Sequence, residues 1–138
     1  MKVKNAIALV LIVVIAAVVI WMVSTEQRPT GFLLDGGNLQ IQGSFGVTVP
    51  LNEITGLEMK DAVPAIGKKT NGSGLGSKYK GAFELADGTK ARLYVDASKP
   101  PFISFQQGGT FFYINAGTPE ETRGLFDQLK AALQSVMK

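Results

Sequence analysis

The most constraining feature of this sequence is an uninterrupted apolar run near its N-terminus. Residues 6–23 are eighteen consecutive residues without a charge, a polar side chain, a glycine or a proline. As a helix, the run would be about 27 Å long, close to the roughly 30 Å hydrocarbon core of a bilayer. We therefore expect a single transmembrane helix over residues 6–23, with a short basic N-terminal tail at 1–5 and a linker at 24–30.

Two other interpretations of the run stay open. A cleaved signal peptide also begins with basic residues, but its apolar region is usually about 7–15 residues long. A buried core helix of a globular protein normally keeps a polar face. Lys2 and Lys4 precede the run and only Arg28 follows it closely, so the positive-inside rule places the N-terminus in the cytoplasm. The predicted localisation is the cell membrane, single-pass, with the C-terminal domain outside the cytoplasm.

The rest of the chain, residues 31–138, has the size of one domain. From Gly31 on, eleven basic residues nearly balance ten acidic ones, so the charge gives no indication of nucleic-acid binding. The sequence contains no Cys and no His, which excludes disulfides, zinc sites of the usual ligand set and His-dependent nucleophile systems. We expect no metal and no cofactor, and the sequence identifies no small-molecule substrate.

Short segments with turn signals between them indicate a mainly β domain. Alternating apolar residues predict antiparallel strands over residues 32–34, 39–42, 45–49, 53–60, 79–85, 91–95, 102–107 and 110–115. Asp87-Gly88 predicts a hairpin with a type I′ turn. We expect a long connection over residues 61–80.

The last segment changes to helical spacing. Thr118-Pro119-Glu120-Glu121 has the pattern of a capping box, with Thr as N-cap and Pro at the first helical position. Leu125, Leu129, Leu133 and Val136 then recur on one face. We expect an amphipathic helix from about 119 to 136 that packs against the sheet.

Three segments carry a resemblance to a known family. They are Phe45–Ile54, the Gly-rich stretch before Tyr79–Leu85, and Gly109–Asn115 running into the capping box. Over residues 32–137 the sequence resembles a bacterial pleckstrin homology (PH-like) domain. The resemblance implies a bent antiparallel sheet or barrel of about seven strands, capped by the helix, that serves binding and assembly.

Two departures limit what the resemblance implies. Eukaryotic pleckstrin homology domains usually carry a Trp in the final helix, whereas the single Trp here is Trp21. No basic residue lies between Asp35 and Gly43, where a phosphoinositide-binding domain would hold its lysines or arginines. Phosphoinositide binding is therefore not carried over.

Two sets of residues are candidate contact sites. Lys68, Lys69, Lys78 and Lys80 lie in or beside the Gly-rich connection at 61–80, which is either an anion- or lipid-binding loop or a solvated, flexible one. In the run Phe111–Ile114, one alternate pair must face the core. Phe112 and Ile114 form a possible partner surface if they are not covered by the helix.

These observations predict a membrane-anchored binding or assembly module, without catalysis, that contacts a protein partner or a second copy of itself. One alternative is sensing of lipid headgroups or anions by the Lys68–Lys80 segment. Another is a small envelope hydrolase without His or Cys, built for example on Ser73 or Ser77 with Lys78. That hydrolase would need a pocket in which such groups converge.

Overall fold

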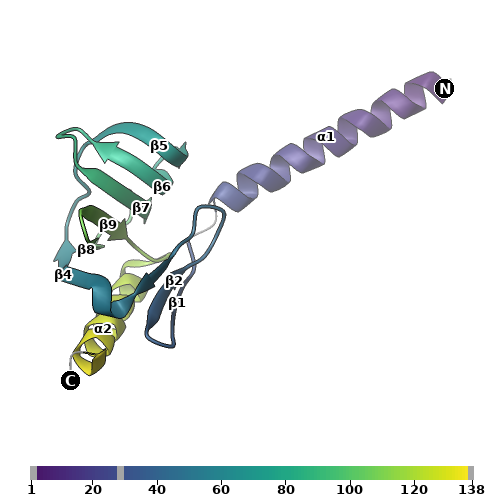
Figure 1. The fold of residues 1–138 in the computed structure, drawn as a ribbon. Helices are drawn as coiled ribbons and strands as arrows, with labels where there is room; N and C mark the ends of the chain where they lie inside the picture. Colours follow the sequence, from purple (N-terminus) through teal and green to yellow (C-terminus); the bar gives the residue numbers. More distant parts are fainter. Residues whose placement is uncertain (1–2, 28–29, 137–138) are drawn as a thin grey trace.

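The computed structural model describes residues 3–27 and 30–136, with side chains described over 5–19 and 30–136. The elements in chain order are α1 (Val3–Gln27), β1 (Phe32–Asp35), β2 (Asn38–Ile41), β3 (Thr48–Pro50), the short helix η1 (Leu51–Glu53), β4 (Ile54–Lys60), β5 (Ile66–Leu75), β6 (Lys78–Leu85), β7 (Lys90–Asp96), β8 (Phe102–Gln107), β9 (Thr110–Ile114) and α2 (Pro119–Val136). In Figure 1, α1 extends away from the strands, and α2 lies at the lower end of the β domain. The predicted mainly β domain with a C-terminal helix is confirmed.

The strands form two sheets. One has the order β1-β2-β3, and the other has the order β4-β8-β9-β7-β6-β5. All neighbouring strands are antiparallel except β7 and β9, which are parallel. The wholly antiparallel prediction was wrong at this one place, because the β8–β9 hairpin inserts between β4 and β7 and places β9, not β8, beside β7.

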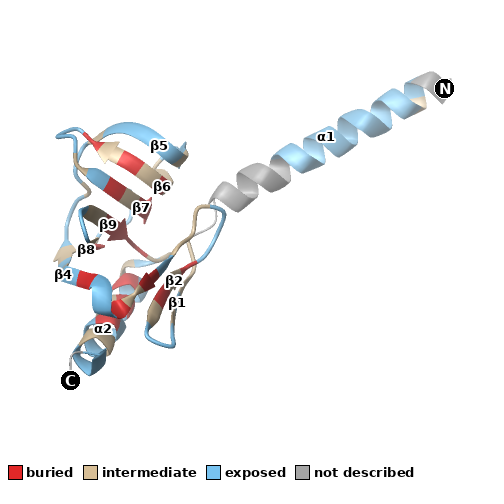
Figure 2. Ribbon diagram, viewed as in Figure 1, coloured by how far each residue is buried: buried red, intermediate tan, exposed pale blue. Residues whose placement is uncertain are grey.

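Two apolar cores lie on opposite faces of the larger sheet. Phe112 and Ile114 of β9 face the first core, where Leu129 of α2 and residues of β2 and β3 complete the packing. Phe111 and Tyr113, which alternate with them, face the second core. Figure 2 shows buried residues along the central strands and on the inner side of α2.

The predicted partner surface at Phe112 and Ile114 was therefore wrong. Their exposed fractions are 1% and 0%. The ring of Phe112 stacks on Phe105 at a centroid distance of 4.8 Å. The pair is covered because β9 is a central strand whose face turns toward α2 and the smaller sheet.

The segment predicted as a long connection contains a strand. Residues Ile66–Leu75 form β5, the edge of the larger sheet, and pair with β6. Gly72 and Gly81 face each other in this pair. A Cβ on Gly72 would lie 2.5 Å from the Lys80 carbonyl oxygen, and one on Gly81 would lie 2.7 Å from Gly72 Cα. The glycines thus allow two backbones to approach closely, where the sequence suggested a flexible loop.

The two predicted turn and cap signals have different outcomes. The β6–β7 hairpin forms at Asp87-Gly88, but only Gly88 has a positive φ, +88°, so the turn is not type I′. The Gly88 N–H donates to the Leu85 carbonyl at 2.9 Å, as in a type I turn followed by a glycine bulge.

The helix prediction is confirmed: α2 begins at Pro119, and the Glu121 N–H donates to Thr118 Oγ1 at 3.2 Å.

Within residues 3–27 and 30–136, no helix combines the length and apolar character needed to cross a membrane. The predicted transmembrane helix at 6–23 was therefore wrong for the described chain, and with it the single-pass cell-membrane localisation. The linker predicted at 24–30 also begins too early, since α1 continues to Gln27. The predicted tail at 1–5 lies partly inside α1, and Met1, Lys2, Arg28 and Pro29 lie outside the described residues.

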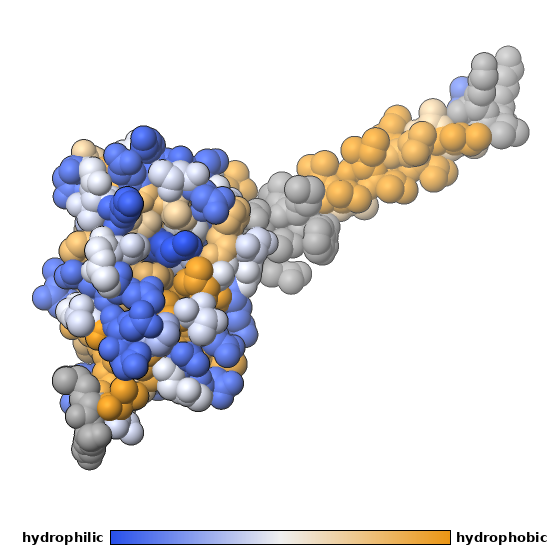
Figure 3. Space-filling view, viewed as in Figure 1, coloured by the Kyte–Doolittle hydropathy of each residue, from blue (hydrophilic) through white to orange (hydrophobic). Residues whose placement is uncertain are grey.

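The apolar side chains described in α1, over residues 5–19, belong to neither core of the β domain. Ile12 and Ile15, for example, are 63% and 61% exposed. Figure 3 shows the described part of α1 as a continuous hydrophobic surface, whereas the face of the β domain seen there is mixed. The described side chains of α1 therefore add nothing to either core of the β domain.

Candidate functional site

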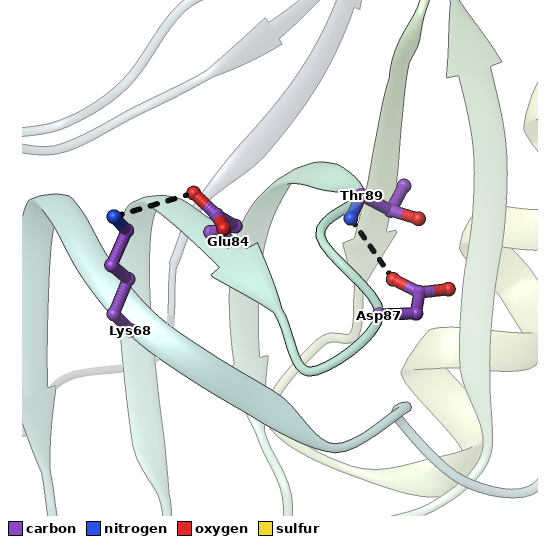
Figure 4. A network of polar contacts seen from close by, with 4 residues as sticks. All are labelled: Lys68, Glu84, Asp87 and Thr89. Atoms are coloured by element: carbon purple, nitrogen blue, oxygen red, sulfur yellow. Dashed lines mark hydrogen bonds and ion pairs between the residues drawn. The ribbon is translucent and has the colours of Figure 1, made fainter.

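The four lysines singled out by the sequence lie on one hairpin but form two separate groups. Lys68 and Lys69 belong to β5, whereas Lys78 and Lys80 belong to β6. Lys68 Nζ lies 3.6 Å from Glu84 Oε2, its partner across the hairpin (Figure 4). Because a strand rises about 3.3 Å per residue, the backbone of Lys80 lies roughly 13 Å along β6 from that of Glu84. The structure therefore does not bring the four ammonium groups together.

Lys78 and Lys80 instead lie with a third lysine, Lys99, around a small cavity. The two β6 lysines are two residues apart, so their side chains leave the same face of the strand. The other lining residues are Thr30, Tyr94, Val95, Asp96, Asn115, Ala116 and Gly117. The cavity measures about 30 Å³, enough for one or two water molecules or for the polar end of a larger ligand.

Asn115 holds the wall of this cavity in place. Its side chain is 3% exposed. Its Oδ1 accepts a hydrogen bond from the Asp96 N–H, and its Nδ2 donates to the carbonyls of Asp96 and Lys99, each at 2.9 Å. Its own N–H donates to the Tyr94 carbonyl at 3.2 Å. One side chain thus ties the end of β7 and the following turn to the end of β9.

Asp96 is the single acidic residue among the described residues that line the cavity. Its Oδ1 accepts hydrogen bonds from the hydroxyls of Ser77 at 2.7 Å and Ser98 at 2.6 Å. Partial burial acts to raise the pKa of Asp96, but these hydrogen bonds and the Lys99 charge outweigh it and hold the pKa below the ordinary value. The carboxylate is therefore ionised at neutral pH.

The residues that line the cavity carry a surplus of positive charge, with three lysines against one aspartate. Lys99 Nζ also donates to the Gly117 carbonyl at 3.3 Å. Lys78 and Lys80 already take part in interactions within the protein, so a bound anion would share them. Such a wall favours an anionic group, such as a phosphate or a carboxylate.

The sequence did not identify Lys99 or Asn115 as site residues. Lys99 lies in a turn directly before Pro100, and a lysine at such a position is typical of an ordinary exposed surface. Asn115 offered one usable signal, since a polar residue at the end of the apolar run Phe111–Ile114 needs hydrogen-bond partners if it is buried.

In the part of the chain that the structure describes, no three acidic, His or Cys side chains gather to hold a metal ion. No protein-family model, curated protein or solved structure matches this chain. The cavity is therefore the main indication of function, and the resemblance to the PH-like family stays a prediction from the sequence.

Proposed function

We propose that this chain is a binding module that recognises an anionic group at the cavity formed by Lys78, Lys80 and Lys99. The observation that carries the proposal is that three lysines from two separate segments line one small hollow. The buried Asn115 fixes the backbone on two sides of that hollow. A phosphate or carboxylate is the ligand class that such a wall suits.

Binding is a better account of this geometry than catalysis. A hydrolase built on Ser77 and Lys78 needs a base whose pKa lies near the working pH. The Ser77 hydroxyl donates its proton to Asp96 and not to Lys78. The pKa of Asp96 lies below its ordinary value, so that carboxylate is a weak base in place of the lysine. We therefore propose no catalytic residue and no enzyme activity.

The resemblance to the PH-like family supports the same class of function. That family serves binding and assembly, and the chain shares its mainly β character and its C-terminal helix. We propose a PH-like module whose physiological ligand is a protein partner, a second copy or a headgroup that presents the anion. The proposed anion contacts are Lys78, Lys80 and Lys99, in place of the predicted set with Lys68 and Lys69.

The test is a phosphate titration of the full chain, followed by phosphorus NMR at low and high salt. An exposed ion pair is worth about 0.2–1 kcal/mol, so replacing all three cavity lysines by Gln should weaken binding about tenfold. Salt should weaken wild-type binding as well. The matched control is Lys68→Gln/Lys69→Gln/Lys130→Gln, which removes the same charge away from the cavity and should bind phosphate like wild type.

Vesicles separate the two sources of phosphate. Stronger binding to anionic than to neutral phospholipid vesicles, lost in the cavity variant alone, would identify a lipid headgroup. Phosphate binding without that preference would identify a soluble anion. An equal loss in the cavity variant and in the control would contradict the proposal, since it would show only an effect of net charge.

A further inference from the structure

A second surface, independent of the lysine cavity, lies between the outer edge of β1 and one face of α2. Two hollows mark it. The first, of about 780 Å³, lies between Gly31 and Phe32 on one side and Glu121, Gly124, Leu125 and Gln128 on the other. The second, of about 250 Å³, lies between Leu34 and Asp35 on one side and Ala132, Ser135 and Val136 on the other. Figure 1 shows the β1–β2 hairpin next to α2.

Both hollows lie along the same two elements, and we call the two hollows together the groove. The first is lined by the start of β1 and the first half of α2, and the second by the end of β1 and the last turns of α2. Both elements therefore run along the groove in the same direction. Residues 31–36 of an extended strand span about 17 Å, and residues 121–136 of a helix span about 22 Å. The groove is long enough for an extended segment of about five or six residues.

The β1 side of the groove presents backbone hydrogen-bonding groups. β1 is an outer strand that pairs with β2. The Gly31 carbonyl accepts a hydrogen bond from the Gln42 N–H at 2.9 Å, so residues 31, 33 and 35 direct their backbone groups toward β2. By the alternation of an antiparallel ladder, the N–H and C=O groups of Phe32 and Leu34 point away from β2, across the outer edge of β1.

The α2 side of the groove leaves room for a strand, and the charged residues of the groove are acidic. Gly124 and Ser135 carry small side chains, and a Cβ on Gly124 would meet no atom within 4 Å. Asp35 and Glu121, one at each end, are the charged residues among the described residues that line the two hollows, and no lysine or arginine is among them. Since both are acidic, the groove complements a cationic segment.

We propose that this groove binds an extended segment of a partner protein that carries basic side chains and adds as a strand to β1. Backbone bonds to Phe32 and Leu34 would fix the segment, as in other strand-addition complexes. Alternate side chains would face α2, and basic residues would lie near Asp35 and Glu121. This inference does not depend on the lysine cavity, and either one can fail alone.

The probe is a dye-labelled peptide with the sequence Lys-Val-Lys-Val-Lys-Val, measured by fluorescence anisotropy with the full chain. We expect saturable binding that weakens with salt, and binding of the Glu-Val-Glu-Val-Glu-Val peptide at least about tenfold weaker. N-methylation of alternate peptide amides should abolish binding in one of the two registers and spare the other. That result distinguishes strand pairing from simple charge attraction.

Two helix variants locate the binding surface. Gly124→Leu places a bulky side chain in the groove and should weaken the lysine peptide about tenfold. Gln134→Leu adds the same side chain on an exposed part of α2 that lines neither hollow and should leave binding unchanged. Asp35→Asn/Glu121→Gln should weaken the lysine peptide and reduce its salt dependence.

Three results would overturn the proposal. They are equal binding of the lysine and glutamate peptides, no effect of either N-methylation register, and equal effects of Gly124→Leu and Gln134→Leu. Concentration-dependent dimerisation that Gly124→Leu abolishes, without peptide binding, would assign the groove to a second copy and would also overturn it.

Discussion

Asn115→Ala tests whether the cavity wall is held as the structure indicates. The change removes three side-chain hydrogen bonds, one accepted from Asp96 N–H and two donated to the Asp96 and Lys99 carbonyls. Each is worth about 0.5–1.5 kcal/mol, and partners left unpaired in a buried site add to the cost. We expect the free energy of unfolding to fall by about 2–4 kcal/mol, a large part of the roughly 5–15 kcal/mol of a typical domain.

The assay is urea and thermal unfolding followed by circular dichroism. For a domain of about 100 residues, the expected loss lowers the melting temperature by about 8–16 °C. The control is Ser98→Ala, which removes an exposed hydroxyl that contacts Asp96 and should cost less than about 1 kcal/mol. If Asn115→Ala cost no more than Ser98→Ala, the inferred role of Asn115 would be refuted.

Three further predictions concern single residues. Between pH 7 and acid pH, the free energy of unfolding should fall less in the Asp96→Asn variant than in the wild type. Because the pKa of Asp96 is lowered in the fold, the ionised side chain stabilises the fold above the ordinary pKa of 3.8. This contribution disappears as the pH falls through the folded-state pKa. Urea unfolding from pH 7 downward measures the difference. Tyr94→Phe removes the hydroxyl that donates to the Phe45 carbonyl at 2.6 Å and should cost about 1 kcal/mol. Because burial raises the pKa of Tyr94 above its ordinary value of 10.0, the wild type should lose more stability than this variant in unfolding curves measured above pH 10. Gly124→Ala should stabilise α2 by about 0.5–1 kcal/mol, since its Cβ meets no neighbour, and a lower melting temperature would contradict that reasoning.

Local signals were sufficient for the parts of the fold that depend on neighbours in sequence. The helix at Pro119–Val136 follows from its cap and its apolar spacing, and the structure gives the same bounds. The hairpin of β8 and β9 forms across Gly108-Gly109 as its turn predicts. In both cases, the residues that decide the structure lie within a few positions of each other.

The missed elements depend on contacts between distant segments. β5 has the composition of a loop. The need for glycine there follows from the close approach of the β6 backbone, where Gly72 faces Gly81. The parallel pairing of β7 with β9 depends on where the β8–β9 hairpin inserts, which no local pattern specifies.

The candidate site could be predicted only in part for the same reason. Lys78 and Lys80 stood out as basic residues of one segment, and both line the cavity. Lys68 stood out equally but pairs with Glu84 instead. Lys99 lies in the bend after β7 and Asn115 directly follows β9, so their part in the site becomes visible only in three dimensions.

The most direct test of the central claim is to map bound phosphate on the full chain by amide NMR. We predict that the largest shift changes on titration occur at Lys78, Lys99 and Gly117, around the cavity, and that they disappear when the three cavity lysines are replaced by Gln. Shift changes centred on Lys68 and Lys69, or spread evenly over the surface lysines, would contradict an anion-binding site at the cavity.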